Sequence, residues 1–577
     1  MTHLSRRLAR VAALGAIGLM AGGALAQGSL SGAYLAGLNA AKRGDVEAAA
    51  IYLSRALDQD PGDIALMEQT LIHMVAAGRM DEAKELAERL SGFEPKHRIA
   101  NLVIVADEMK RGDYAAARAG IEATPEAFHP LVGALLSGWA AEGAGDAAAA
   151  ETALEGLGGR AVLELFSDYH RGLMRRAAGD AAGAVEAFSR LFENGMAPAA
   201  RMARAAAGAK AAAGDMDGAK QILETAAAGA FGDAALEADL AEVEAGKTPP
   251  PLVSDASEGA AEALYGLGAA LGRDGDAKLG LFYVRLAIWM RPDLVEARLL
   301  AADLLAGSGQ PALAIRAYEG VPPDSVYGRA AEIGRADALD EVGRRSEAVE
   351  ALKALVRRDP TAAEAQLALG DLLRRADRFP EAAAAYDAAV KLAEAEGQVS
   401  WALLYQRAIA WERSGEWPKA EADFQAALKL QPDQPLVLNY LGYSWLDRGE
   451  NIGPAMEMIR KAVAARPDDG YIVDSLGWGH FLLGEYKEAA EVMERAVELR
   501  PVDAVITDHY GDALWMVGRK REAEFQWRRA LSFEPEEKDR ARIHRKLEIG
   551  LDKVRAEEAA AAAPAAAPAA DANKNGG

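Results

Sequence analysis

The chain has 577 residues, of which 51% are hydrophobic but only 6% aromatic, and its formal net charge is -22. This hydrophobic share excludes wholesale disorder, and the predominance of alanine over aromatic residues favours closely packed helices over a β-sandwich. The negative charge repels phosphate groups and anionic headgroups, so nucleic acid is not expected as a partner. The sequence has no cysteine, which excludes disulfides, thiolate metal sites and a lipid anchor on cysteine.

Residues 1–26 have the pattern of a signal peptide. Arg6, Arg7 and Arg10 precede an apolar run of about 15 residues, too short for the roughly 20 that cross a bilayer, and Ala24 and Ala26 provide small residues for signal peptidase. We therefore expect cleavage after Ala26, export to the periplasm, and membrane association that is only peripheral or through a partner. Whether the protein takes the general secretory or the twin-arginine route, and whether it associates with the outer membrane, stays open.

A period of about 34 residues runs through the chain that follows. Turn-forming glycines recur at this spacing, at Gly44, Gly78, Gly112, Gly145, Gly179, Gly214, Gly275, Gly309, Gly343, Gly415, Gly449, Gly484 and Gly518. Prolines follow about half a period later, among them Pro432, Pro467, Pro501 and Pro535. Because each period contains two helix-breaking positions, each unit is expected to consist of two helices.

Residues 470–503 show the physical logic of one unit. Gly477 and Ala489 have almost no side chain, so two antiparallel helices can approach closely. Gly484 would make the turn between the helices, and Pro501, which has no amide proton, would end the second helix.

This unit resembles the tetratricopeptide repeat (TPR) family in its Leu-Gly, aromatic, Ala, Ala and Pro positions. Similar sets recur at Leu441-Gly442, Trp445, Ala455, Ala462 and Pro467, and at Tyr510-Gly511, Ala523, Trp527, Ala530 and Pro535. The resemblance implies an all-α, right-handed superhelical solenoid of about fourteen antiparallel helix pairs. It also implies a protein that binds other proteins or peptides and is not an enzyme. The units before residue 245 are alanine-rich and degenerate.

The period breaks once, between Gly214 and Gly275, where three consecutive prolines (residues 249–251) force extended backbone. We therefore expect an N-terminal arm at 27–245, a Pro-rich linker at 246–257 and a C-terminal arm at 258–536. Residues 537–558 would form a capping helix that shields the last hydrophobic face, and residues 559–577 a disordered Ala/Pro tail.

The sequence predicts no catalytic residue, no metal site and no cofactor. The eight histidines are scattered, and we find no phosphate-binding loop, nucleophile elbow or His-x-x-x-His pair in a suitable context. His480 falls at a position facing the partner helix, where a core role is favoured over catalysis.

The family resemblance also implies a concave groove lined by the first helix of each unit. Ten residues fall at groove-facing positions: Tyr405, Asn439, Tyr443, Tyr471, Asp474, Trp478, Phe481, Asp508, Asp512 and Trp515. Their aromatic rings would anchor apolar groups, and their carboxylates and amide would hydrogen-bond an extended backbone. The alternative is that these residues pack between adjacent first helices. The paired lysines and asparagines with which chaperone-binding TPR proteins hold C-terminal carboxylates are not visible.

Residues 400–535, including the stretches 439–463 and 511–531, also look like the end of envelope TPR proteins of Gram-negative bacteria. Among these is an adaptor lipoprotein that delivers cell-wall hydrolases to a carboxyl-terminal processing protease. This likeness implies a periplasmic adaptor or scaffold that could deliver substrates to an envelope protease, although the missing cysteine departs from the lipidated adaptors. The alternatives are a structural component of a polysaccharide-export or outer-membrane assembly machine, and a glycan-binding module that uses the aromatic residues.

Overall fold

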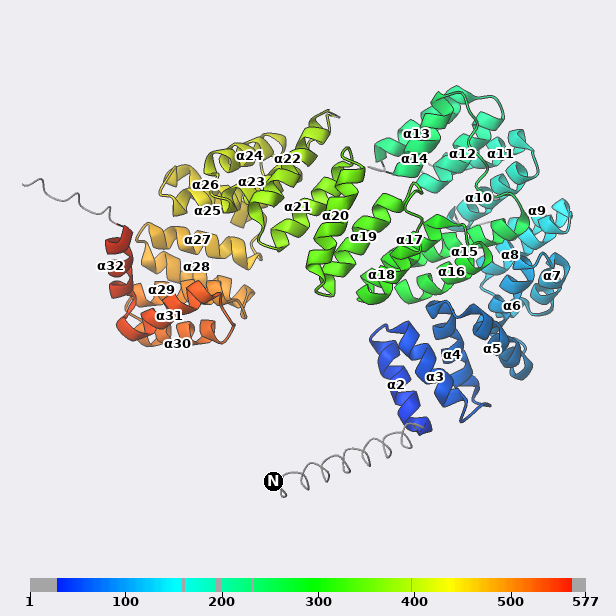
Figure 1. Ribbon diagram of the computed structural model, residues 1–577, viewed down its shortest axis with the longest axis horizontal. Helices are drawn as coiled ribbons and strands as arrows, with labels where there is room; N and C mark the ends of the chain where they lie inside the picture. Colours follow the sequence, from blue (N-terminus) through cyan, green and yellow to red (C-terminus); the bar gives the residue numbers. More distant parts are fainter. Residues whose placement is uncertain (1–28, 158–160, 193–198, 230–232, 396, 563–577) are drawn as a thin grey trace, which may run out of the picture. The chain divides into compact units, whose positions relative to one another are not determined.

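The computed structural model describes residues 29–157, 161–192, 199–229, 233–395 and 397–562 (Figure 1). The predicted signal peptide and nearly all of the predicted tail lie outside these residues. Within them all regular secondary structure is helical, which confirms the predicted all-α class. None of the described helices is both long enough and apolar enough to span a bilayer.

The chain divides into two compact units, residues 1–358 and residues 359–577. The helices of the first unit are α2 (Leu30–Lys42), α3 (Val46–Leu57), α4 (Ile64–Ala77), α5 (Met80–Phe93), α6 (Arg98–Lys110), α7 (Tyr114–Ala123), η1 (Pro125–Ala127), α8 (Pro130–Gly143), α9 (Ala147–Glu155), α10 (Ala161–Ala177), α11 (Ala181–Ser189), η2 (Arg190–Phe192), α12 (Ala200–Ala212), α13 (Met216–Gly229), α14 (Ala234–Glu244), α15 (Ala256–Arg273), α16 (Ala277–Met290), α17 (Val295–Gly307), α18 (Pro311–Glu319), α19 (Gly328–Glu341) and α20 (Arg345–Arg358).

The helices of the second unit are α21 (Ala363–Arg375), α22 (Phe379–Ala395), α23 (Trp401–Arg413), α24 (Trp417–Leu430), α25 (Pro435–Asp447), α26 (Ile452–Ala465), α27 (Gly470–Leu482), α28 (Tyr486–Leu499), α29 (Ala504–Met516), α30 (Lys520–Leu531), α31 (Glu537–Ile549) and α32 (Leu551–Ala562). Consecutive helices pack as six pairs from α2 to α13 and as eight pairs from α15 to α30. These fourteen pairs agree with the predicted number of units.

Two features of the repeat set the geometry of each pair. All thirteen glycines predicted to form turns have positive φ angles, for example 79° at Gly484, a conformation that residues with a side chain adopt only at a cost. The pair α21–α22 has no such glycine, and Asp377 adopts the left-handed conformation there with φ 55°. Close approach of the helices also requires small residues, because a Cβ atom on Gly477 would lie 2.6 Å from Cγ of Met493. The turns and the small contact residues were therefore correctly predicted.

The proline-rich segment 246–257 lies inside the first unit and packs against it. Val253 is buried, and the carbonyl of Leu252 accepts a hydrogen bond of 2.7 Å from Arg291. After this segment α15 packs against α6, α8 and α10, and α16 packs against α4 and α6. The pairs before the prolines and the helices after them therefore share one compact unit, and the division into units falls further along the chain.

The predicted single capping helix at 537–558 is instead two helices, α31 and α32, which meet at Gly550. Gly550 has φ 84°, and a Cβ atom there would lie 2.6 Å from the ring of Trp515. Lys546 on α31 is buried and donates to both carboxyl oxygens of Asp508 (2.8 and 2.7 Å) and to Asp512 (2.6 Å). The cap is therefore fixed to α29 by a buried cation between two buried carboxylates.

Substitution of Lys546 by Met should destabilise the second unit by about 3–5 kcal/mol, because the buried Asp508 and Asp512 would lose their closest cation and keep only Arg542, at 3.8 and 3.3 Å. Urea unfolding followed by tryptophan fluorescence measures this change, since Trp515 and Trp527 lie beside the cap. Lys538→Met, on an exposed position of α31, is the matched control and should change the stability little. Equal stability of the two variants would contradict the role given to Lys546.

Candidate functional site

The structure separates the ten residues predicted to line a binding groove into three groups. In the first group the side chains contact other parts of the same chain; its members are Phe481, Asp508, Asp512 and Trp515. Phe481 is buried in the core, and Asp508 and Asp512 are held by Lys546. The indole nitrogen of Trp515 donates to Asp552 of α32 at 2.9 Å. Phe481, Asp508 and Asp512 are buried, so the expectation of an open groove position is wrong for these three residues. Trp515 stays partly exposed beside α32, and its role in binding stays a prediction.

Two further residues lie apart from the others. Tyr405 on α23 packs against Phe424 and Tyr440, with ring centroids 6.0 Å away in each case, and burial raises the pKa of its hydroxyl to about 12. Tyr471, at the start of α27, is 53% exposed and lies beneath the guanidinium of Arg500. Tyr405 is thus mainly a packing residue, and Tyr471 is an exposed ring at a helix end.

The remaining four residues, Asn439, Tyr443, Asp474 and Trp478, form a patch on α25 and α27, and His509 of α29 joins it. Asp474 is only 6% exposed, and its Oδ2 lies 2.9 Å from Nδ1 of His509. The ring of Trp478 stacks on His509, with centroids 4.1 Å apart, and on Phe481, with centroids 4.8 Å apart. We call these five residues the inner patch. His509 escaped the sequence analysis because its position in the unit is not one that faces a groove in this family.

The inner patch contains buried acceptors without donors. Oδ1 of Asp474 and Oδ1 of Asn439 are buried and have no hydrogen-bond partner among the described residues. Burial raises the pKa of the Tyr443 hydroxyl, and the carboxylates of Asp447, Asp474 and Glu412 raise it further. Tyr443, Asn439 and Trp478 are each partly exposed. The patch therefore presents aromatic edges beside carboxylate and amide oxygens that lack donors, and its role in binding stays a prediction.

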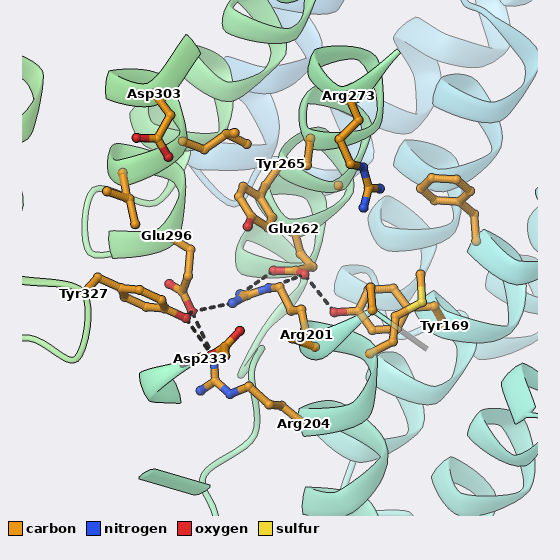
Figure 2. Close-up of a pocket in the computed structure, with 18 of the residues that line it drawn as sticks. Tyr169, Arg201, Arg204, Asp233, Glu262, Tyr265, Arg273, Glu296, Asp303 and Tyr327 are labelled. Atoms are coloured by element: carbon orange, nitrogen blue, oxygen red, sulfur yellow. Dashed lines mark hydrogen bonds and ion pairs between the residues drawn. The ribbon is translucent and has the colours of Figure 1, made fainter. Parts of the chain in front are cut away.

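A second candidate lies in the first unit, where a cavity of about 350 Å³ is enclosed by α10, α12, α14, α15, α17 and Tyr327 (Figure 2). At its base the guanidinium of Arg201 donates two bonds of 2.7 Å to Glu262 and a third to Glu296. The hydroxyl of Tyr169 donates to Glu262 at 2.8 Å, and that of Tyr327 donates to Glu296 at 3.1 Å. Figure 2 shows these side chains converging from helices on both sides of the proline-rich segment.

The charges at this base are balanced. Burial alone raises the pKa of Glu262, but the charge and hydrogen bonds of Arg201 outweigh it and leave that pKa below its usual value. Burial lowers the pKa of the neighbouring His170 to about 4, so its ring is neutral and accepts a hydrogen bond from Trp139. The glutamates are therefore ionised and the imidazole is neutral around neutral pH. This arrangement suits a cross-link between helices better than proton transfer.

Sequence reasoning missed this cluster, although it left one signal. Arg201 and Arg204 lie three residues apart in the alanine-rich helix α12, where a solvated helix face would have been the ordinary interpretation. Their partners are far away in sequence, since Glu262 is 61 residues from Arg201. Among the described residues no group of three or more His, Asp and Glu side chains is placed to hold a metal ion.

Substitution of Arg201 by Met should destabilise the first unit by about 3–5 kcal/mol, because it leaves the buried Glu262 without a cation and leaves Glu296 with only Arg204. Thermal and urea unfolding monitored by circular dichroism would report the loss. Arg175→Met is the control, since Arg175 is exposed and pairs only with Asp180 at the surface. A loss for Arg201→Met no larger than that of the control would refute the cross-link.

Protonation of His509 should make the stability of the second unit depend on pH. Burial lowers the pKa of His509, but Asp474, with Asp508 and Asp512 beyond it, outweighs burial and raises the pKa above the ordinary value of 6.5. The stabilisation is therefore complete below pH 6.5 and is lost as the pH rises through the folded-state pKa. Denaturation midpoints between pH 6 and 9 should fall for the wild type and stay flat for His509→Gln. An equal pH dependence of the midpoints in the wild type and in His509→Gln would contradict the raised pKa of His509.

Family models described as tetratricopeptide repeat match residues 333–397, 401–434 and 475–503. A TPR repeat-containing protein of Pseudomonas aeruginosa is 31% identical over 160 residues, which cover 28% of this chain and 26% of that protein. Superkiller complex protein 3 of Homo sapiens is 31% identical over 150 residues, 26% of this chain and 9% of that protein. The chain thus matches about a quarter or less of each relative's length.

Two solved structures are also similar. A tetratricopeptide repeat protein from Parabacteroides merdae shares 15% identity, with 44% of this chain and 98% of that one covered and a TM-score of 0.38. A crystal structure of MamA shares 22% identity over 29% of this chain and 94% of that one, with a TM-score of 0.26. TPR arrays are scaffolds for protein–protein interaction. The family matches, the glycine turns and the fourteen packed helix pairs together show that the chain belongs to the tetratricopeptide repeat family.

Proposed function

We propose that the protein is exported to the periplasm and joins other proteins there, with the inner patch on α25, α27 and α29 as a contact surface. The observation that carries the proposal is the side chain of Asp474, which is buried while its Oδ1 has no donor. A buried acceptor without a hydrogen bond costs about 1–3 kcal/mol, so a ligand that supplies a donor gains that energy back.

An extended protein segment has the groups that the inner patch lacks. Its backbone amides can donate to Asp474 and Asn439, and its apolar side chains can pack on the edges of Tyr443 and Trp478. A glycan would also supply hydroxyl donors, but the ring of Trp478 already stacks on both Phe481 and His509. These contacts leave less of the indole for a sugar ring to stack on, which favours a protein segment.

The sequence supports the location and the finer role. Residues 1–26 have the basic, apolar and small-residue regions of a signal peptide. The likeness of residues 400–535 to envelope adaptors supports a role in bringing substrates to an envelope protease. The inner patch lies within that stretch, so partner binding and delivery would use the same surface.

Export can be tested with residues 1–40 fused to alkaline phosphatase, which is active only after transfer to the periplasm. The fusion should be active, and a fusion that starts at residue 27 should be inactive. N-terminal sequencing of the exported full-length chain should begin at Gln27. An inactive long fusion, or a full-length chain that keeps residues 1–26 in the cytoplasm, would overturn the proposed location.

Partner contact can be tested with a photo-crosslinking amino acid placed at Tyr443 in the full-length protein in cells. The matched position is Phe525 on α30, which is 63% exposed but lies on a second helix of its pair. Position 443 should give one or a few discrete protein adducts that Asp474→Asn weakens, and position 525 should not give the same adducts. Identical adducts from both positions, or none from position 443, would refute the inner patch as a contact surface.

A further inference from the structure

The N-terminal helix pairs carry a hollow that the inner patch does not involve. Because α15 and α16 pack against α4, α6 and α8, they cover part of the surface that the first helices of these pairs would otherwise expose. Beside α15 there is still a cavity of about 420 Å³, lined by α6, the segment from η1 into α8, Phe166 of α10, α15 and α16. This volume lies within the range of about 300–1,000 Å³ that is typical of small-molecule pockets.

The walls of this hollow are almost entirely apolar. The deeper part is formed by buried aliphatic and aromatic side chains, namely Leu102, Phe128, Leu131, Val132 and Leu267. The mouth is formed by half-buried ones, namely Ile99, Phe166, Leu271 and Leu279. An apolar surface of this kind in a hollow gains free energy when an apolar group displaces water from it.

One end of the hollow is cationic. Arg98, the first residue of α6, lines the cavity, and no carboxylate of the described residues forms an ion pair with it. Burial raises the pKa of Tyr283, and the charge of Arg98 lowers it in part, so the two side chains lie near each other. His129, the N-cap of α8, lines the same hollow, and helix N-termini favour negative charge.

The lining contains one carboxylate, on Asp274, which forms no ion pair with Arg98. Asp274 is exposed at the end of α15, and it is not among the groups that shift the pKa of Tyr283. The hollow therefore has an apolar body and, at its solvent-exposed edge, the cation of Arg98, which forms no ion pair with a described carboxylate. A purely apolar side chain of another protein would fill the apolar body but would form no ion pair with Arg98.

We propose that this hollow binds a medium-chain fatty acid, with the acyl chain in the apolar body and the carboxylate on Arg98. The chain supplies the apolar surface that the walls need, and the carboxylate supplies the partner that Arg98 lacks. Tyr283 lines the same hollow near Arg98, and its hydroxyl can donate a hydrogen bond to a carboxylate. The inference is independent of the proposed scaffold function, because none of these residues belongs to the inner patch.

Isothermal titration of the full-length protein with decanoate and with decanol tests this site. Decanoate should bind with a stoichiometry of one and about tenfold more tightly than decanol, because only decanoate can form the charged hydrogen bonds with Arg98. Arg98→Gln should remove this preference by weakening decanoate binding about tenfold while leaving decanol unchanged. Arg118→Gln, an exposed arginine on α7 outside the hollow, should bind both compounds like the wild type.

A second variant, Ala270→Phe, tests whether the hollow itself is the binding site. Ala270 is a small, partly exposed residue that lines the hollow, and a phenyl ring there would fill it. This variant should lose both decanoate and decanol while keeping the circular dichroism spectrum of the wild type. The proposal is overturned if wild-type protein binds no decanoate, if Arg98→Gln binds it as tightly as Arg118→Gln does, or if Ala270→Phe binds it undiminished.

Discussion

Close contact between the two helices of each pair is the constraint on which the rest of this structure depends. It requires a residue without a side chain where the helices meet, as at Gly477, and a left-handed turn where the chain reverses, as at Gly484. These two requirements recur with the period of the sequence and build fourteen pairs without disulfides, since the chain has no cysteine. Because each pair packs on its neighbours, hydrophobic surface remains uncovered at the end of the array and where the order of pairs changes.

Buried ion pairs occur at the end of the array and where the order of pairs changes. At the C-terminal end Lys546 fixes the cap to Asp508 and Asp512, and in the first unit Arg201 joins helices from both sides of the proline-rich segment through Glu262. Such pairs add little net stability over apolar packing, but the loss of one partner is costly, so they fix which surfaces meet. In the second unit the cap pairs with the carboxylates of α29, whereas Oδ1 of Asp474 on α27 and Oδ1 of Asn439 on α25 have no donor. The position of the inner patch is therefore a consequence of the cap.

The sequence predicted those features of the fold that are caused by residues within a single unit. Turn glycines, small contact residues and helix-ending prolines act within one unit, so the all-α class and the number of pairs could be predicted. The turn at Asp377 was missed because its residue type does not indicate a positive φ. Other contacts depend on residues that only the fold brings together. They are the packing of α15 on α8, the ion pair of Arg201 with Glu262 and the ion pair of Lys546 with Asp508. Three of the ten predicted site residues, Phe481, Asp508 and Asp512, were misplaced for this reason, and His509 was overlooked.

The cap covers part of the surface of α29 and leaves the surface of α25 and α27 accessible. Tyr443 and Asp512 occupy equivalent positions in their units, each directly after a contact glycine. Since the chain has no cysteine, thiol labelling of Tyr443→Cys and Asp512→Cys compares the two places without background. Position 443 should be labelled rapidly, and position 512 should be strongly protected. Equal labelling rates would contradict it.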